Sequence, residues 1–166
     1  MRVALAIVVP LVASLVQGGV AGAVNVGGAF PNVPVLAAAS WSVAAGAGEG
    51  LWWAFVGGLV TDVLSAGPLG AFTVAALPGT LLVGLGERSS AKPIPILAGA
   101  LAVGVAALIA QLIYLGLLAF LGRSFGPPDV TLAQTVGVGI YTGALALAAY
   151  PLARIGRRLT ERESAF

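Results

Sequence analysis

The sequence predicts an all-α integral membrane protein, a compact bundle of about six transmembrane helices. Of its 166 residues, 59% are hydrophobic and only 8% are charged, whereas a soluble domain carries roughly a quarter charged residues. The apolar runs are long and lack the period-two alternation of a membrane-spanning strand, so they predict helices. The chain has no cysteine and no histidine. Disulfides, thiolate or imidazole metal sites and histidine acid-base chemistry are therefore excluded.

The first span is predicted from Arg2 to about Val24, an apolar run of the length that crosses a bilayer. Its basic start and the small residues 21–23 are also typical of a secretory signal peptide. Because further spans follow, we favour an uncleaved first helix. Residues 25–34 contain two prolines, two glycines and two asparagines and predict a loop.

The second and third spans are predicted at about residues 35–47 and 51–64, as a tight hairpin with a glycine-rich turn at 46–50. The fourth span covers about residues 69–86, with a kink expected at Pro78. Residues 87–93 are a polar loop. The fifth span runs from about 94 to 121, and it carries Gln111 and Tyr114 one turn apart. A sixth span at about 132–152 follows the loop at 123–129.

These elements divide into a six-helix transmembrane domain, residues 1–153, and a basic cytoplasmic tail, residues 154–166. Six spans place both termini on one side of the membrane. All cationic residues except Arg123 then share that side: Arg2, Arg88, Lys92, Arg154, Arg157, Arg158 and Arg162. Because positive loops stay inside, the sequence predicts a multi-pass protein with both termini cytoplasmic.

Asp62 is the only acidic residue that lies within an apolar run. Together with Gly58, Thr61 and Ser65 it occupies one face of the third helix, which ends at a corner. A carboxyl group inside the membrane costs free energy and therefore indicates a partner or a coupled ion. Alternatively, the side chain of Asp62 reaches water or forms a hydrogen bond with the neighbouring turn. We predict a partner-binding face made of Gly58, Thr61, Asp62, Ser65, Pro68 and Gly70.

No glycine-rich phosphate loop, paired carboxylates or nucleophile beside a base is present, so we expect no enzyme, cofactor or metal site. Gln111 and Tyr114 could line a ligand pocket, although a glutamine bonded to a neighbouring helix is commoner. The arginine-rich tail fixes orientation or binds anionic lipid or a cytoplasmic partner. Small residues four apart, such as Gly139 and Gly143, favour packing within the bundle over a dimer contact. Nothing indicates nucleic-acid binding.

The third helix and its corner carry a motif. Residues 49–50, 57–59, 62, 64–65 and 68–70 follow the pattern G-L-x-x-D-x-L-S-x-x-P-L-G with an upstream Glu-Gly. This pattern resembles the rod shape-determining protein MreD family. Upstream, Phe30-Pro31-Asn32 is similar to the family's Pro-Asp entry to the second span, with Asn32 in place of the usual acid.

The resemblance implies a non-enzymatic scaffold of the bacterial cell-elongation machinery, which directs rod shape and peptidoglycan synthesis from the inner (cytoplasmic) membrane. It implies a bitopic MreC-type partner, and through it RodA, a penicillin-binding transpeptidase and, indirectly, MreB filaments. The family's fold is similar to the substrate-binding subunit of energy-coupling-factor vitamin transporters. The alternative hypothesis is therefore that the chain is such a vitamin-binding subunit.

Overall fold

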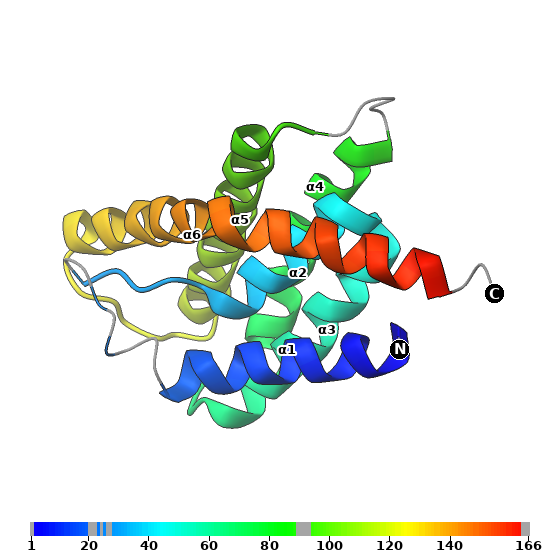
Figure 1. Ribbon diagram of the computed structural model, residues 1–166. Helices are drawn as coiled ribbons and strands as arrows, with labels where there is room; N and C mark the ends of the chain where they lie inside the picture. The colour runs from blue at the N-terminus through cyan, green and yellow to red at the C-terminus, as the bar shows by residue number, and fades with distance from the viewer. Residues whose placement is uncertain (1, 20–22, 24, 26–27, 89–93, 164–166) are drawn as a thin grey trace.

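The computed structural model describes residues 2–19, 23, 25, 28–88 and 94–163, and the extended elements in this part of the chain are all α-helices. Figure 1 shows the helices packed into one bundle, with the start of α1 and the end of α6 at the same end of it. The six helices are α1 (Arg2–Gly19), α2 (Val33–Ala45), α3 (Ala47–Leu64), α4 (Ala71–Arg88), α5 (Ile96–Phe120) and α6 (Pro128–Glu163).

Helix α2 lies in the middle of the bundle and contacts all five other helices. Val35 and Val43 on this helix are completely buried, and Trp41 stacks on Trp53 of α3 with the ring centroids 4.5 Å apart. A helix that is apolar on every side is stable when protein surrounds it. This position accounts for a helix of 13 residues, which is shorter than a full membrane crossing.

The second, fourth and fifth helices lie within about two residues of the expected spans, and the turn between α2 and α3 differs from the prediction. The predicted turn over residues 46–50 is wrong beyond Gly46, because α3 already begins at Ala47. Gly46 has a φ of +102°, a conformation that suits glycine, so this single residue reverses the chain. Glu49 lies in the first turn of α3, where a carboxylate is favourable, and accepts a hydrogen bond of 2.9 Å from the indole of Trp41.

The last helix continues through the boundary expected at residue 153. Helix α6 ends at Glu163, and one of its arginines bonds the bundle: the Arg157 side chain donates to the carbonyl oxygen of Ala44. The guanidinium of Arg154 lies 5.6 Å from the centre of the Tyr150 ring. The basic segment is therefore helical as far as the structure describes it, and its cytoplasmic location stays a prediction.

Helix α1 is docked on α3, and its retention as an uncleaved span stays a prediction. The Ser14 hydroxyl donates to the carbonyl oxygen of Gly57 at 2.8 Å, deep between the two helices. A Cβ built at Gly57 would lie within 3.6 Å of Pro10, Ser14 and Pro34. Gly57 thus lies where the first three helices meet, and its carbonyl oxygen accepts the hydrogen bond between α1 and α3.

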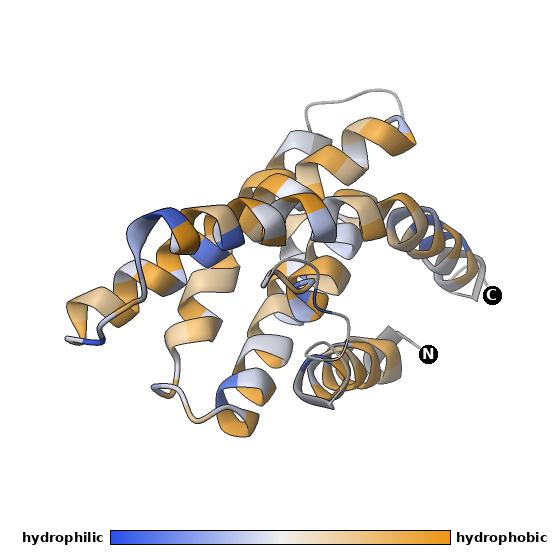
Figure 2. Cartoon of the chain, turned by 90° about the vertical axis from the view of Figure 1, so that its left-hand side faces the viewer, coloured by the Kyte–Doolittle hydropathy of each residue, from blue (hydrophilic) through white to orange (hydrophobic). Residues whose placement is uncertain are grey.

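The outer surface of the bundle is largely apolar. Helices α5 and α6 are both long and apolar enough to cross a membrane, and only 39% and 28% of their most apolar windows are buried. Leu101 and Ile140 are more than 60% exposed, and Figure 2 shows apolar residues along the outer faces of most helices. A core helix of a soluble protein would bury these side chains, so their exposure fits a lipid-facing surface.

Candidate functional site

Asp62 binds the first turn of helix α4. Its carboxyl oxygens accept hydrogen bonds from the backbone N–H groups of Phe72 and Thr73, both at 3.0 Å. The Thr73 hydroxyl donates a third bond, at 2.6 Å. The Asp62 side chain is only 2% exposed. Of the two interpretations offered for this residue, a bond to the neighbouring turn is the one that the geometry bears out.

The sequence around α4 explains why the cap comes from another helix. The first N–H groups of a helix have no partner inside it, and Ser, Thr, Asp or Asn just before the helix usually supplies one. Here that position is Gly70, which has no side chain and a φ of +87°. The chain reverses at Pro68, whose carbonyl oxygen accepts from the N–H of Ala71. Asp62 therefore reaches across the corner and caps α4.

Gly58 lies one helical turn before Asp62 and faces the same helix. A Cβ at Gly58 would lie 2.6 Å from the Cα of Thr73, closer than real side chains approach. This close approach places the carboxyl group of Asp62 within reach of α4. Gly58 and Asp62 are thus brought together by the structure, on a face that α4 covers.

Thr61 and Ser65 line a cavity of about 380 Å³ on another side of the same corner. The Thr61 hydroxyl donates to the carbonyl oxygen of Gly57, and the Ser65 hydroxyl donates to that of Asp62. Gln111 and Tyr114 of α5 line the same cavity. The six predicted partner-binding residues therefore fall into three groups: a covered pair, a cavity-lining pair, and Pro68 and Gly70, which form the corner. Their role in partner binding stays a prediction.

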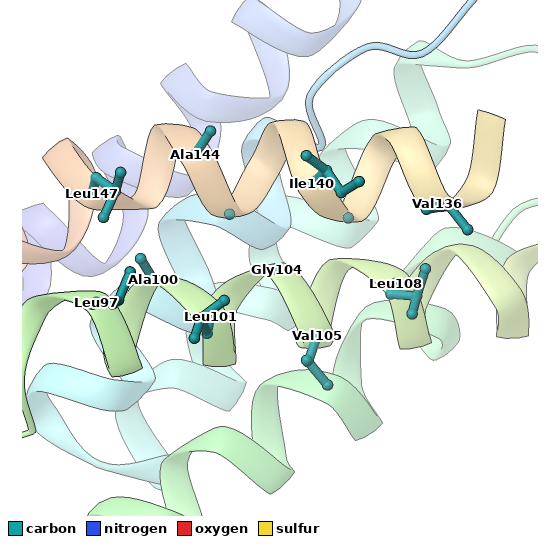
Figure 3. A pocket seen from close by; sticks show the side chains of 12 residues that line it. Leu97, Ala100, Leu101, Gly104, Val105, Leu108, Val136, Ile140, Ala144 and Leu147 are labelled. Atoms are coloured by element: carbon teal, nitrogen blue, oxygen red, sulfur yellow. The ribbon is translucent and has the colours of Figure 1, made fainter. Parts of the chain in front are cut away.

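A second surface feature, which the sequence did not indicate, is an apolar groove of about 360 Å³ between α5 and α6 (Figure 3). The helices run antiparallel there, with Leu97 beside Leu147 at one end and Leu108 beside Val136 at the other. They approach closely because a Cβ at Gly104 would lie 2.9 Å from the carbonyl oxygen of Gly139. Its lining is Leu97, Ala100, Leu101, Gly104, Val105, Leu108, Val136, Gly139, Ile140, Gly143, Ala144 and Leu147.

The glycines in this groove confirm one expectation. Gly143 would place a Cβ 3.3 Å from the Cα of Gly104, so the Gly139 and Gly143 pair packs within the bundle. The sequence offers a similar pair at Gly18 and Gly22, but Gly22 lies outside the described residues. Gly104 is the only residue through which the sequence could have indicated the groove. Its contact with Gly139 and Gly143 on α6 becomes visible only in the folded structure.

Asn32 also has a defined structural position. Its side-chain oxygen accepts a hydrogen bond of 3.2 Å from the N–H of Val35 and so caps α2. Asn and Asp are about equally good in this position. The substitution of asparagine for the acid of the family motif therefore preserves the helix cap.

Comparison with known proteins gives one match. The family model of the rod shape-determining protein MreD matches residues 1–148, which cover helices α1 to α5 and the apolar part of α6. No curated protein and no solved structure matches the chain. The likeness to the vitamin-transporter subunit fold thus stays a prediction.

Proposed function

The chain belongs to the rod shape-determining protein MreD family, a family of membrane proteins, and from this premise we propose that it is a non-enzymatic scaffold of the cell-elongation machinery. Its direct partner is the transmembrane helix of a bitopic MreC-type protein. RodA, a penicillin-binding transpeptidase and, indirectly, MreB filaments are reached through that partner. The six helices all belong to the membrane domain, with both termini in the cytoplasm.

The observation that supports a helix-binding role is the groove between α5 and α6. Its walls are aliphatic side chains spaced four and seven residues apart on each helix, most of them exposed: Leu97, Leu101 and Leu108 on α5, and Val136, Ile140 and Leu147 on α6. Rows with this spacing form ridges that interdigitate with the side chains of a third helix. In a bilayer, where hydrophobicity no longer drives association, this packing and close backbone approach hold helices together. The occupant that fits is an apolar transmembrane helix.

The corner between α3 and α4 is the second candidate for the partner surface. Asp62 has both carboxyl oxygens bonded to α4, so a direct contact with a partner would have to break those bonds. We therefore assign Gly58 and Asp62 an indirect role, in which they position the corner. Thr61, Ser65, Pro68 and Gly70 keep the predicted role of contact residues.

The test compares the two surfaces by measuring energy transfer between the labelled protein and a labelled MreC-type transmembrane peptide in lipid vesicles. Ala144 is an exposed alanine in the groove, and Ala144→Phe fills the groove without touching the core. We expect at least tenfold weaker binding, or about 1.4 kcal/mol or more. Ala98→Phe, at an exposed alanine of α5 outside the groove lining, is the matched control and should bind like wild type.

Wild-type binding by Ala144→Phe would contradict the groove as the docking site. If Ser65→Leu then weakened binding, the corner would be the partner surface. If both variants bound like wild type, the helix-binding role itself would be wrong.

A vitamin-binding transporter subunit remains the second candidate function. The cavity beside Thr61 and Ser65 is the specific observation in its favour, because several polar side chains converge on it. Depletion of the protein in its host distinguishes the two functions: loss of rod shape supports the scaffold, and unchanged rods with a vitamin requirement support the transporter.

A further inference from the structure

The cavity between α1, α3 and α5 is lined partly by polar side chains. It encloses about 380 Å³, and several of its lining side chains carry amide or hydroxyl groups. The full lining is Ser14, Gln17, Gly18, Phe30, Asn32, Thr61, Leu64, Ser65, Phe72, Gln111, Tyr114 and Val138. Cavities of this size hold small molecules.

Two amide groups on one wall have fixed orientations. The side-chain oxygen of Gln17 accepts a 2.8 Å hydrogen bond from the N–H of Val33, and that of Asn32 accepts from the N–H of Val35. These bonds determine which end of each amide is nitrogen. Within the described residues neither side-chain nitrogen has a hydrogen-bond partner, although Asn32 is only 5% exposed. This wall therefore offers hydrogen-bond donors that lack acceptors.

The opposite wall offers both donors and acceptors. Gln111 and Tyr114 make no hydrogen bond within the described residues, and both are half-buried. The Thr61 hydroxyl has used its proton on Gly57, so it can only accept. These groups reach the cavity space, because Ser40 carries the only fully buried side-chain polar atom without a partner among the described residues. The convergence of several such groups on one cavity points to an occupant that bonds them.

The occupant is uncharged. Among the described residues, no lysine, arginine, aspartate or glutamate lines the cavity, and the carboxyl group of Asp62 is already bonded to α4. A charged occupant would therefore find no oppositely charged side chain in this lining. Aromatic side chains complete the walls: Phe30, and Phe72 in edge contact with Tyr114 at 6.0 Å between ring centroids. Such faces pack against the C–H groups of a ring.

We propose that this cavity binds a neutral hydroxylated ring of about the size of a monosaccharide. A ring hydroxyl accepts from the amides of Gln17 and Asn32 and donates to Thr61. Gln111 and Tyr114 can each donate a hydrogen bond to the ring or accept one from it. The ring is supplied as a free solute or as the glycosyl headgroup of a membrane lipid. Phe30, Leu64 and Ser65 in the lining are exposed, so the cavity opens to the surface of the protein. This binding is separate from the α5–α6 groove.

The test uses the full chain purified in a polyoxyethylene detergent, because glycosidic detergents carry the proposed ligand. Two probes are added separately, methyl glucoside and monoglucosyl diacylglycerol, with diacylglycerol as the lipid blank. Native mass spectrometry should show a 1:1 adduct with at least one sugar probe. Binding of both probes identifies a free ring as sufficient, and binding of the lipid alone identifies a headgroup site.

Variants then locate the site. Gln111→Leu and the milder Tyr114→Phe should each weaken the adduct at least fivefold, because each removes hydrogen-bonding groups from the cavity wall. Gln134→Leu makes the same change at an exposed glutamine of α6 outside the lining and should bind like wild type. Absence of an adduct with both probes, or equal binding by all variants, would overturn the proposal and leave water as the occupant.

Discussion

Two helix contacts in this bundle are made in opposite ways. Between α3 and α4, the buried carboxyl group of Asp62 bonds two backbone N–H groups and a hydroxyl. Between α5 and α6, the contact around Gly104 consists of backbone and aliphatic atoms, with an apolar groove beside it. Both contacts depend on glycine for close approach. They differ in whether hydrogen bonds determine the position of the helices.

The difference indicates which contact is closed and which can accept a further helix. A polar group inside a membrane bundle must find its partners within the fold, so the carboxyl group of Asp62 forms its hydrogen bonds with α4. An apolar groove can be filled by lipid chains and exchanges them for a helix at little cost. The residue with the most conspicuous sequence signal therefore bonds within the fold, and the apolar groove is the surface that we propose for a partner.

Breaking the polar contact should have the largest effect. Asp62→Leu leaves two N–H groups and the Thr73 hydroxyl without acceptors in a buried position, so we expect a loss of about 3–5 kcal/mol of unfolding free energy. The measurement is unfolding by sodium dodecyl sulfate in mixed micelles, followed by tryptophan fluorescence. The matched control is Asp129→Leu at an exposed aspartate in the first turn of α6, which should cost about 1 kcal/mol or less.

Equal stability of Asp62→Leu and Asp129→Leu would show that the cap of α4 contributes little. Asp62 would then be free for the partner contact that the sequence first indicated. Retained partner binding by the folded fraction of Asp62→Leu is expected, because the α5–α6 groove is distant in the chain and has no bond to Asp62.

A smaller effect is expected where only the close approach of α3 and α4 is disturbed. Gly58→Ala places a methyl group 2.6 Å from the Thr73 Cα, and relieving such an overlap costs about 1–3 kcal/mol. Gly116→Ala, on an exposed position of α5 with nothing within 4 Å of the added carbon, should instead stabilise the helix by up to about 1 kcal/mol. Opposite signs in the same unfolding assay would confirm the distinction, and equal signs would contradict it.

The helical class and most helix boundaries were predictable because long apolar runs broken by polar or proline-rich loops determine them. The start of α3 was missed because Ala47 and Gly48 resemble a turn in composition, whereas the positive φ of Gly46 alone makes the reversal. The course of α6 beyond residue 153 was also missed. Its arginines indicated a separate tail. In the structure, the Arg157 side chain bonds Ala44 of α2, which lies more than 100 residues earlier in the chain.

The candidate site was predictable only in part. Periodicity correctly placed Gly58 and Asp62 on one helix face, but it does not say what that face contacts. Thr73 completes the Asp62 site from the next helix, and no spacing rule within α3 points to it. Gln111 and Tyr114 were recognised as a possible pocket wall, whereas Gln17 and Asn32 join them only through the fold.

The smallest effect on stability, and the sharpest test of the comparison, comes from the groove. Ile140 is 69% exposed at its rim, so Ile140→Ala removes contacts with lipid and not with the core. We expect unfolding free energy to change by about 0.5 kcal/mol or less, while binding of the MreC-type transmembrane peptide in vesicles weakens several-fold. Leu152→Ala, at an exposed leucine of α6 outside the groove lining, should change neither quantity. A loss of stability without a loss of binding would mean that the groove is packed within the protein itself, and the contrast between a closed polar contact and an open apolar one would fail.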